Sequence, residues 1–203
     1  CQIALDDLDT ENRDLLLKML QNIDQETLRA RDVVKGLLEF SRSEQFRIRA
    51  ASLADTVNRA VRLVKSEVAA DIQIKVVIPD DLIVPMDVQR MQEVFLNLII
   101  NAAQAIEQHG EITIFSEVDA EEEMVIITVH DTGPGIPEQI QGQLFDPFYT
   151  TKEEGKGTGL GLSVVYGIIQ RHHGEITVAS TPGQGASFYL RLPLSPSKDS
   201  SLS

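Results

Sequence analysis

The segment between residues 88 and 108 constrains the fold more than any other part of the chain. Six apolar residues recur there at spacings of three and four, which places them on one side of an α-helix; they are Val88, Met91, Phe95, Leu98, Ala102 and Ala105. A second stripe is polar and consists of Glu93, Asn97 and Asn101, with Gln104 beside them. Asparagine is a poor helix former, and asparagines next to a buried stripe need polar partners. Taken alone, the polar stripe fits a solvated surface as well as a binding site.

The composition predicts one full domain and an appendage. The chain has 203 residues, of which 42% are hydrophobic, but no Trp and only 5% aromatics, so the core must be aliphatic. The single cysteine, Cys1, excludes a disulfide framework and a cysteine-based metal site. No apolar run is long enough to cross a membrane, and no signal peptide is recognisable. Because the first residue is not Met, we expect a piece of a longer protein, which leaves a membrane anchor elsewhere open.

The charge is acidic and unevenly distributed. The net charge is −13; residues 1–50 carry 10 acidic and 8 basic side chains (−2), and residues 51–203 carry 21 and 10 (−11). Such a surface repels nucleic acid and anionic lipid, so we expect neither nucleic acid nor direct membrane contact for this segment. A polyanionic ligand would need a metal ion, helix N-termini or a few placed cations.

Residues 13–43 are predicted to form one long helix. They contain no Pro and one Gly, and their apolar positions alternate spacings of four and three over nearly four heptads. The stripe is broad, which suits a helical bundle better than a strict two-stranded coil. The helix would run roughly 45 Å, too long for one small domain to cover, so we expect a homodimer through it. A helix packed along its own domain is the alternative. Residues 1–8 resemble the end of a preceding antiparallel helix.

Residues 46–194 are predicted to form an α+β domain. Strands are expected at 46–50, 72–78, 82–85, 111–116, 124–130, 175–180 and 186–192, and helices from the cap Ser52 to about residue 70, over 88–108 and over 159–172. Three helices beside a mixed, mostly antiparallel sheet make a two-layer α/β sandwich. The predicted domains are therefore a partial helical hairpin (1–45), the α+β domain (46–194) and a Ser-rich disordered tail (195–203).

Two glycine-rich segments change how the asparagine helix is interpreted. Asp131 lies where an apolar strand ends and is followed by Gly133 and Gly135. A carboxylate there can point into a pocket while the glycines let the backbone approach a ligand; a tight Asx turn is the alternative. Alternating glycines then lead from Gly155 into a helix, whose exposed N–H groups and dipole attract anions. A flexible loop is the alternative, and the spacing matches neither a P-loop nor a Rossmann fingerprint.

The segment between the two glycine motifs predicts a mobile lid. Phe145-Asp-Pro-Phe148 offers hydrophobic anchors, and two threonines and Lys152 follow. Lys152 and Lys156 are the only cations between His130 and Gly167.

In this order, the motifs resemble those of the ATP-binding catalytic domain of sensor histidine kinases, within the superfamily that includes type II topoisomerases and the Hsp90 chaperones. The asparagine helix is similar to the family's N box, residues 131–135 to its G1 box, 145–148 to its F box and 157–161 to its G2 box. The helix ending at Arg42 is similar to the second helix of the family's dimerisation and phosphotransfer domain. The resemblance covers roughly residues 12–193.

The resemblance implies ATP and Mg²⁺ as cofactors and gives each site residue a role. Asn101 would ligate Mg²⁺, with Asn97 supporting the phosphates and Lys152 near the terminal ones; these three would be the catalytic residues. Asp131 would accept the adenine amino group, and Ser187 would help to hold the base. The other residues expected around the nucleotide come from the lid and the glycine motifs; they are Gly133, Gly135, Ile136, Phe148, Thr151, Lys156, Gly157, Thr158, Gly159, Leu160 and Gly161.

One departure from the superfamily bears on the reaction. Its hydrolytic members carry a Glu one turn before the magnesium-binding asparagine, as a general base for water. Here that position is Asn97, and an amide is not a useful base at neutral pH. Phosphoryl transfer is therefore favoured over hydrolysis, although Glu93, one turn further back, keeps hydrolysis open.

The second departure is the phosphoacceptor. In the family it is a His on the first bundle helix, normally followed by Glu or Asp and then Pro. The histidines here are His109, His130, His172 and His173. Only His130 precedes an acid, and it lies on the strand that leads to Asp131. We therefore interpret all four as non-acceptors and expect the acceptor upstream of Cys1.

The sequence thus predicts the cytoplasmic kinase core of a two-component sensor, which in the full protein could be membrane-anchored. It would bind Mg-ATP and pass the γ-phosphoryl group to an upstream histidine, for relay to the receiver domain of a response regulator. Two alternatives stay open: an ATP hydrolase of the same superfamily, and a nucleotide-binding pseudokinase that serves as a scaffold.

Overall fold

The computed structural model describes residues 15–20, 23, 27, 46–65, 68–106, 109–152 and 157–195. Residues 15–20, 23 and 27 are helical, as the heptad pattern predicts. The rest of the predicted helix over 13–43, most of the predicted hairpin domain, Lys156 and residues 196–203 of the predicted tail lie outside the described residues. Within the described part, no helix is both long enough and apolar enough to cross a membrane.

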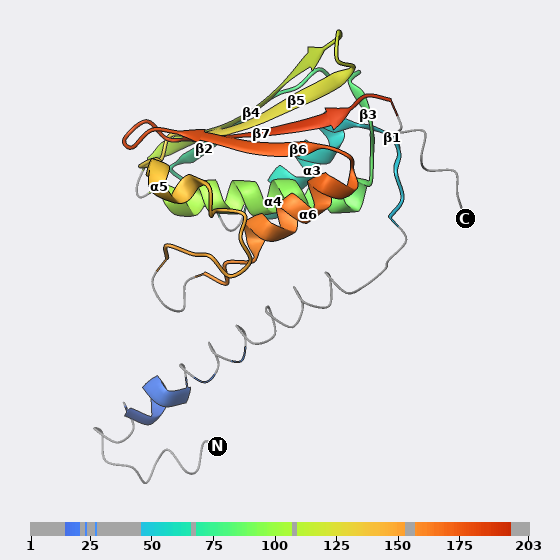
Figure 1. The fold of residues 1–203 in the computed structure, drawn as a ribbon. Coiled ribbons are helices and arrows are strands. Elements are labelled where there is room, and N and C mark those ends of the chain that lie inside the picture. Colours follow the sequence, from blue (N-terminus) through green and yellow to red (C-terminus); the bar gives the residue numbers. More distant parts are fainter. Residues whose placement is uncertain are drawn as a thin grey trace.

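A five-stranded sheet forms one layer of the domain and the helices form the other (Figure 1). In spatial order the strands are β2 (Ile72–Val77), β4 (Gly110–Asp119), β5 (Met124–Asp131), β7 (Ala186–Pro193) and β6 (Glu175–Ser180). Only β2 and β4 pair in parallel, because α4 makes the crossover between them; the other neighbours are antiparallel. The predicted α+β sandwich with a mostly antiparallel sheet is confirmed.

Three helices cover one face of the sheet, with α3 and α6 packed against α4 (Figure 1). They are α3 (Leu53–Val64), α4 (Val88–Ala105) and α6 (Gly161–Arg171). A short helix that the sequence did not predict, α5 (Glu138–Gln141), follows β5. A separate antiparallel pair, β1 (Arg49–Ser52) and β3 (Ile83–Met86), lies beside the main sheet.

Helix α4 forms the centre of the core. Four predicted core positions are buried, namely Met91, Phe95, Leu98 and Ala102, together with Val94 and Ile99. The buried surface is wider than the predicted stripe because α4 contacts two helices as well as the sheet. Full burial of a side chain such as Phe95 contributes about 1.5–3 kcal/mol to stability. Asp87 caps the helix, since its side chain accepts hydrogen bonds from the backbone N–H groups of Gln89 and Arg90.

Several predicted boundaries shift for local reasons. Helix α6 begins at Gly161 rather than at Gly159, because Gly159 has a φ of +65°, which a right-handed helix does not allow. Strand β1 begins at Arg49 rather than at residue 46, because the N–H of Arg47 bonds to the Asp87 carboxylate instead of to a strand. Helix α3 ends at Val64, earlier than predicted, although its predicted cap Ser52 does accept from the N–H of Asp55.

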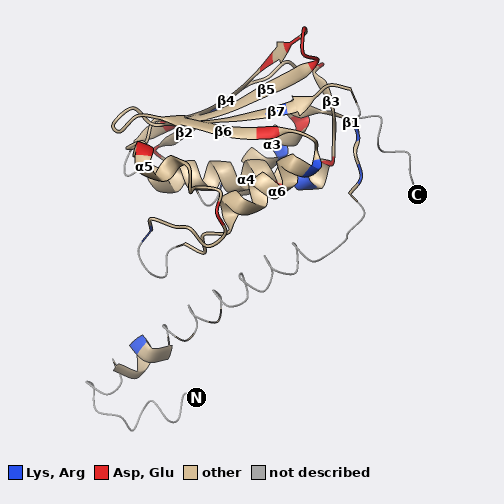
Figure 2. Ribbon diagram, viewed as in Figure 1, with Lys and Arg blue, Asp and Glu red and all other residues tan. Residues whose placement is uncertain are grey.

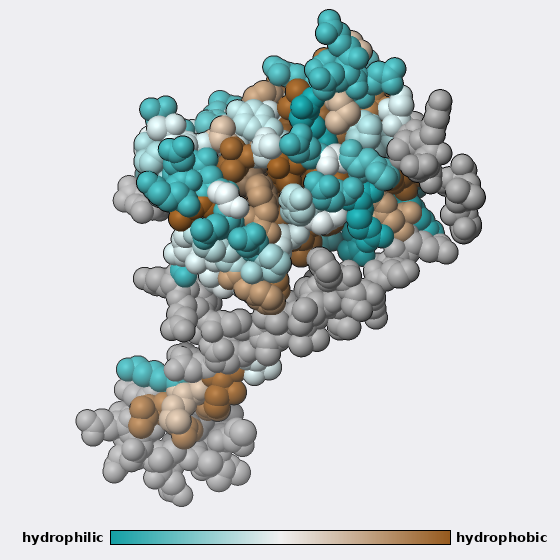
Figure 3. Space-filling model, in the orientation of Figure 1, coloured by the Kyte–Doolittle hydropathy of each residue, from teal (hydrophilic) through white to brown (hydrophobic). Residues whose placement is uncertain are grey.

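Charge and apolar surface are distributed unequally over the molecule. Basic residues gather around β1, α3 and the end of α6, whereas the turn between β4 and β5 is acidic (Figure 2). Apolar side chains lie exposed on the N-terminal helix, where Leu15, Met19 and Ile23 are 57%, 55% and 60% accessible (Figure 3). An exposed apolar stripe of this kind needs a partner.

Candidate functional site

A cavity of about 890 Å³ lies between α4, the end of β5 and the lid segment, which we define as residues 142–152 and 157–160. Helix α4 and the sheet supply Asn97, Asn101, Ala102, Gln104, Ala105, Asp131, Ala186 and Phe188. The remaining lining residues belong to the loop after β5, α5, the lid segment and the start of α6; they are Pro134, Gly135, Ile136, Pro137, Ile140, Leu144, Tyr149, Thr150, Thr151, Lys152, Gly157, Thr158, Gly159, Gly161 and Leu162. The asparagine helix and both glycine motifs therefore line one cavity, whereas none of residues 145–148 does.

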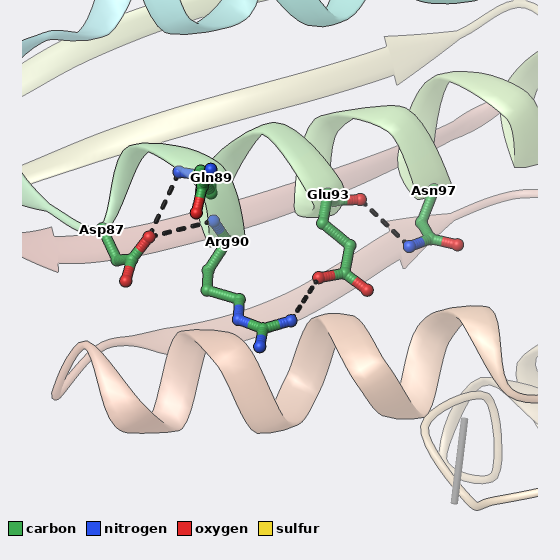
Figure 4. A network of polar contacts seen from close by, with 5 residues as sticks. All are labelled: Asp87, Gln89, Arg90, Glu93 and Asn97. Carbon is green, nitrogen blue, oxygen red and sulfur yellow. Dashed lines mark hydrogen bonds and ion pairs between the residues drawn. The ribbon is translucent and has the colours of Figure 1, made fainter. Parts of the chain in front are cut away.

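The two asparagines face the beginning of α6. The side-chain amide of Asn97 donates to the backbone carbonyl of Glu93 at 3.0 Å, which leaves its oxygen pointing along α4 away from Glu93 (Figure 4). A Cβ atom on Gly161 would lie 3.0 Å from that oxygen and 3.8 Å from Nδ2 of Asn101. Glycine at position 161 thus allows the N-terminus of α6 to approach both asparagines. Its N–H groups and dipole make this end of the cavity favourable for an anion.

Lys152 connects the lid segment to α4. Its ammonium group lies 3.4 Å from Oδ1 of Asn101 and donates to the side-chain oxygen of Gln104. Partial burial lowers the pKa of Lys152. Two amide oxygens on consecutive turns of α4 are therefore oriented toward a cation, and Lys152 lines the cavity beside them.

Asp131 is the buried acid of the site, with only 5% of its surface exposed. Its Oδ1 accepts from the N–H of Gly133 at 2.8 Å. Burial raises the pKa of the Asp131 carboxyl, while hydrogen bonds from the N–H groups of Gly133 and Ala186 act in the opposite direction. A buried acceptor on the wall of a largely apolar cavity is suited to bind an amino group.

The loop after β5 is fixed by residues that sequence reasoning missed. The N–H of Ile136 donates to the Ser180 hydroxyl at 2.8 Å, and the Gln141 side chain donates to the carbonyls of Ile136 and Ser180 at 2.8 and 2.9 Å. Gln141 lies on α5, for which four residues gave no periodic signal. This loop brings Gly135 so close to β6 that a Cβ on it would lie 2.3 Å from the carbonyl oxygen of Thr181.

A backbone hydrogen bond joins the two parts of the lid segment, residues 142–152 and 157–160. The N–H of Phe148 donates to the carbonyl of Gly159 at 2.9 Å, and both residues have positive φ. The ring of Phe145 packs against Tyr166 of α6 at 5.9 Å between ring centroids. Phe148 itself is 55% exposed and does not line the cavity.

Most of the predicted site residues come together, but some do not. The cavity is lined by Asn97, Asn101, Asp131, Gly135, Ile136, Thr151, Lys152, Gly157, Thr158, Gly159 and Gly161. Gly133, Phe148, Leu160 and Ser187 are not among the lining residues, and Lys156 lies outside the described residues. Gly133 still contributes through its hydrogen bond to Asp131.

The expectation for Ser187 needs correction. Its hydroxyl lies 3.0 Å from Nδ1 of His130, whereas its neighbours Ala186 and Phe188 line the cavity. Successive residues of a strand point to opposite faces, so Ser187 points away from the cavity. The same alternation, applied to β7, would have identified Ala186 and Phe188 in advance.

Glu93 does not reach the cavity either. Its carboxylate lies 3.1 Å from Nη1 of Arg90, one turn earlier on α4 (Figure 4). Glu93 is therefore placed to pair with Arg90 and not to activate a water molecule in the cavity. This geometry weakens the hydrolase alternative.

The side chains of the cavity fit a metal ion that is bound mainly by the phosphates of a nucleotide and only partly by the protein. Within the described ranges, no group of three or more His, Cys, Asp or Glu side chains could hold a metal ion. The available amide oxygens on α4 are those of Asn97, Asn101 and Gln104. Mg²⁺ commonly takes one or two protein oxygens together with phosphate oxygens and water, so these residues fit Mg²⁺ bound with a nucleotide.

Comparison with known proteins shows to which family the chain belongs. Residues 86–196 match the family model described as histidine kinase-, DNA gyrase B- and HSP90-like ATPase. The chain is 38% identical over 188 residues to the sensor kinase CckA of Brucella abortus (86% of this chain, 20% of CckA). It is 37% identical over 179 residues to the sensor histidine kinase ZraS of Escherichia coli K12 (87% of this chain, 38% of ZraS).

Solved structures give the same result. The catalytic domain of the histidine kinase ThkA is 31% identical, with a TM-score of 0.66 over 74% of this chain and 97% of that domain. ThkA in complex with the response regulator protein TrrA matches 97% of this chain and 56% of ThkA, with 28% identity and a TM-score of 0.76.

The chain belongs to the histidine kinase-, DNA gyrase B- and HSP90-like ATPase family. The two relatives named above are sensor kinases. It spans 20% of the length of CckA and 38% of that of ZraS.

Proposed function

We propose that this chain is the kinase core of a two-component sensor histidine kinase, working in the cytoplasm, where ATP is available. It would bind Mg-ATP and transfer the γ-phosphoryl group to a histidine on the phosphotransfer helix of its own or a partner chain. The observation that carries the proposal is the meeting of Asn97 and Asn101 with the N-terminus of α6 in the cavity that also contains buried Asp131.

Each part of the cavity has a task in this proposal. Asp131 accepts the adenine amino group, and the apolar wall formed by Ile136, Leu144 and Phe188 packs on the base. Asn101 would hold Mg²⁺, which neutralises phosphate charge and orients the terminal phosphate when it is bound. The N–H groups at the start of α6, together with Lys152, bind the phosphate oxygens.

The transfer itself needs positioning more than covalent help. The bond between the γ-phosphorus and the bridging oxygen breaks, ADP leaves with that oxygen, and a bond forms from the γ-phosphorus to the acceptor nitrogen. Lys152 stabilises the charge on the phosphates, and the lid segment excludes water from the reacting atoms. Glu93 is engaged by Arg90 rather than placed at the cavity, which supports transfer over hydrolysis.

Two of the chain's histidines are unsuited to be the acceptor by their contacts. His130 pairs with Ser187 on the face of the sheet opposite the cavity. His172 is 2% exposed and follows the end of α6 that is remote from Gly161. The proposal takes as its acceptor a histidine of the phosphotransfer helix, outside the described domain.

We further propose a homodimer through the N-terminal helix and relay to a response regulator. The exposed apolar side chains of residues 15–20 and 23 support the first. The second is supported by the likeness to ThkA, which has been crystallised with a response regulator.

The test uses γ-labelled ATP, Mg²⁺ and the chain extended upstream through the helix that carries the acceptor. Label on the protein that is labile in acid and stable in alkali, and that is lost in Asn101→Ala, is the expected result. Ser187→Ala serves as the matched control, because this side chain points away from the cavity and its loss should leave labelling intact. Tight ATP binding without label would favour a scaffold. Steady phosphate release that is lost in Glu93→Ala would favour a hydrolase.

A further inference from the structure

A buried histidine, His172, lies just beyond the end of α6 that is remote from the cavity. Its Nδ1 is 2.8 Å from the carbonyl oxygen of Ile168, and the backbone N–H of Asp87 donates to its Nε2 at 2.9 Å. A carbonyl only accepts and an amide N–H only donates. The ring must therefore be uncharged, with its proton on Nδ1. His172 thus joins the end of α6 to the start of α4.

The segment that leads into the catalytic domain, residues 46–48, is held at the same place. The ring of Phe46 packs edge-on against His172 at 4.6 Å between centroids, and the Arg171 guanidinium lies 4.4 Å from the centre of the Phe46 ring. The N–H of Arg47 donates to Oδ2 of Asp87 at 2.9 Å. We call the group formed by Phe46, Asp87, Arg171 and His172 the junction.

The junction is connected to the cavity by two rigid elements. Helix α4 starts at the junction and carries Asn97 and Asn101, while α6 starts with Gly161 at the cavity and ends at the junction. The other carboxylate oxygen of Asp87 caps α4 (Figure 4). A shift at the junction would therefore move the leading segment relative to both helices that form the phosphate end of the cavity.

We propose that His172 is a positioning residue for phosphoryl transfer: by holding Asp87 and Phe46 together in its uncharged form, it fixes how the segment leading from the N-terminal helix is attached to the α4–α6 pair. The role rests on the proposed function, because the acceptor histidine would reach the nucleotide only if this attachment has the right geometry. His172 does not touch the nucleotide cavity and is not itself catalytic.

Charge at the junction makes the attachment sensitive to pH. Asp87 favours a proton on His172, whereas Arg171 and His173 oppose it, and burial lowers the pKa of His172 below its ordinary value of 6.5. The Arg47 side chain lines a hollow of about 700 Å³ together with Asp87, Arg49 and Arg59, which adds positive charge nearby. A proton on Nε2 would face the N–H of Asp87, donor against donor, so protonation would open the junction.

Amide hydrogen exchange on the full chain tests the attachment without any need for kinase activity. The amides of Arg47 and Asp87 report directly on the two hydrogen bonds of the junction. We expect Phe46→Ala to speed exchange at Arg47 roughly tenfold or more, and His172→Gln to speed it at both positions. In the double variant, the exchange rate at Arg47 should be little higher than in either single variant, because both substitutions disrupt the same junction. Wild-type exchange at Arg47 in Phe46→Ala would overturn the proposal.

The pH dependence gives a second test with a matched control. After correction for intrinsic exchange, protection of Arg47 should fall several-fold between about pH 7.5 and about pH 5.5 in the wild type. The dependence should vanish in His172→Gln and persist in His173→Asn, which changes the exposed neighbour and suits its positive φ. Nitrogen chemical shifts of His172 should show the Nδ1–H tautomer. Dependence that persists in His172→Gln, or is lost in His173→Asn, would contradict the proposal.

The functional test separates positioning from binding. In the chain extended to include the acceptor helix, Phe46→Ala should slow autophosphorylation about tenfold while the Kd for Mg-ADP stays within about twofold of wild type. Equal losses in binding and transfer, or no loss in transfer, would contradict the positioning role. If the wild type shows coupled exchange at the junction but no transfer, the proposed function fails while the attachment stands. If the wild type transfers the phosphoryl group and Phe46→Ala changes neither exchange nor transfer, the proposed function stands while the positioning role fails.

Discussion

The two ends of the α4–α6 pair use polar side chains in opposite ways. At the cavity, Asn97, Asn101 and Lys152 direct polar atoms to a space large enough for a nucleotide. At the junction, both ring nitrogens of His172 are bonded within the protein, and the histidine is buried. The role of a polar residue thus depends on which groups its side chain bonds to. Polar atoms at the cavity are available to a ligand, whereas the ring nitrogens of His172 at the junction bond to other parts of the chain.

The largest expected effect comes from closing the approach between α6 and the asparagines. In Gly161→Val, a Cβ 3.0 Å from Oδ1 of Asn97 plus two methyl groups would push the helices apart, at a cost of about 1–3 kcal/mol. Calorimetry should show weaker Mg-ATP binding as well as a lower Tm.

The control for this substitution is Gly167, six residues further along the same helix. A Cβ on Gly167 would meet nothing within 4 Å, so Gly167→Ala should stabilise α6 by about 0.5–1 kcal/mol and leave ATP binding unchanged. Equal losses of ATP affinity and Tm in both variants would contradict this prediction. They would mean that any substitution in α6 has this effect, whether or not it lies beside the asparagines.

Asp131→Asn should separate binding from stability. Asparagine keeps an oxygen for the N–H of Gly133 but loses the negative charge that, in the proposed function, binds the amino group of the nucleotide. ATP affinity should therefore fall by about 1.4–2.8 kcal/mol, or roughly 10–100-fold. Stability at neutral pH should change little, because relief of the cost of burying the charge offsets the weaker hydrogen bonding to the N–H group of Ala186. Titration calorimetry and urea unfolding measure the two quantities. A parallel loss of both would assign Asp131 a structural role only.

The same residue gives a pH dependence with a definite sign. Burial raises the pKa of Asp131 above its ordinary 3.8, so just above pH 3.8 the folded protein holds a proton that the unfolded chain has released. The free energy of unfolding should therefore fall as pH rises through this range, and this contribution should be absent in Asp131→Asn. ATP affinity should move the other way, because in the proposed function the amino group of the nucleotide binds the ionised carboxylate.

At the junction the sign is reversed. The folded protein disfavours the proton on His172, so the free energy of unfolding should fall as pH drops below about 6.5, where the unfolded chain binds that proton. Urea unfolding at several pH values should show the slope in wild type and lose most of it in His172→Gln. If the slope survives that substitution, another group is responsible.

The smallest effect is expected for Ser187→Ala. This change removes one partly buried hydrogen bond to His130, so stability should change by about 1 kcal/mol or less and ATP affinity should not change. A clear loss of ATP affinity would restore Ser187 to the site.

Local patterns were enough to predict the parts of the fold that depend on neighbours in sequence. The periodicity of α4, the cap Ser52 and the strand alternation all appear in the structure. The parallel pairing of β2 with β4 was not foreseen, because register between distant strands is not encoded in either strand alone. The start of α6 was placed too early because the positive φ of Gly159 is imposed by its contact with Phe148.

The candidate site shows the same division. Asn101 and Asp131 were predicted from motifs that place chemistry at fixed spacings. Gln141 was missed because α5 is too short to show a period, and its partner Ser180 is 39 residues away. His172 was interpreted only as a non-acceptor, since nothing near it in the sequence indicates that Asp87, 85 residues earlier, would bond to its ring.

The contact between Lys152 and α4 has a consequence for nucleotide selection. The lysine meets two amide oxygens, which are dipoles and not charges, so the lid segment is held only weakly to the helix. A bound polyphosphate would offer the same ammonium group full negative charges, and more of them with each added phosphate. We therefore expect the lid segment to close most firmly over the triphosphate and progressively less over the diphosphate and monophosphate. Selection would then depend on the charge of the nucleotide as well as on the shape of its base. The diphosphate would dissociate more readily than the triphosphate.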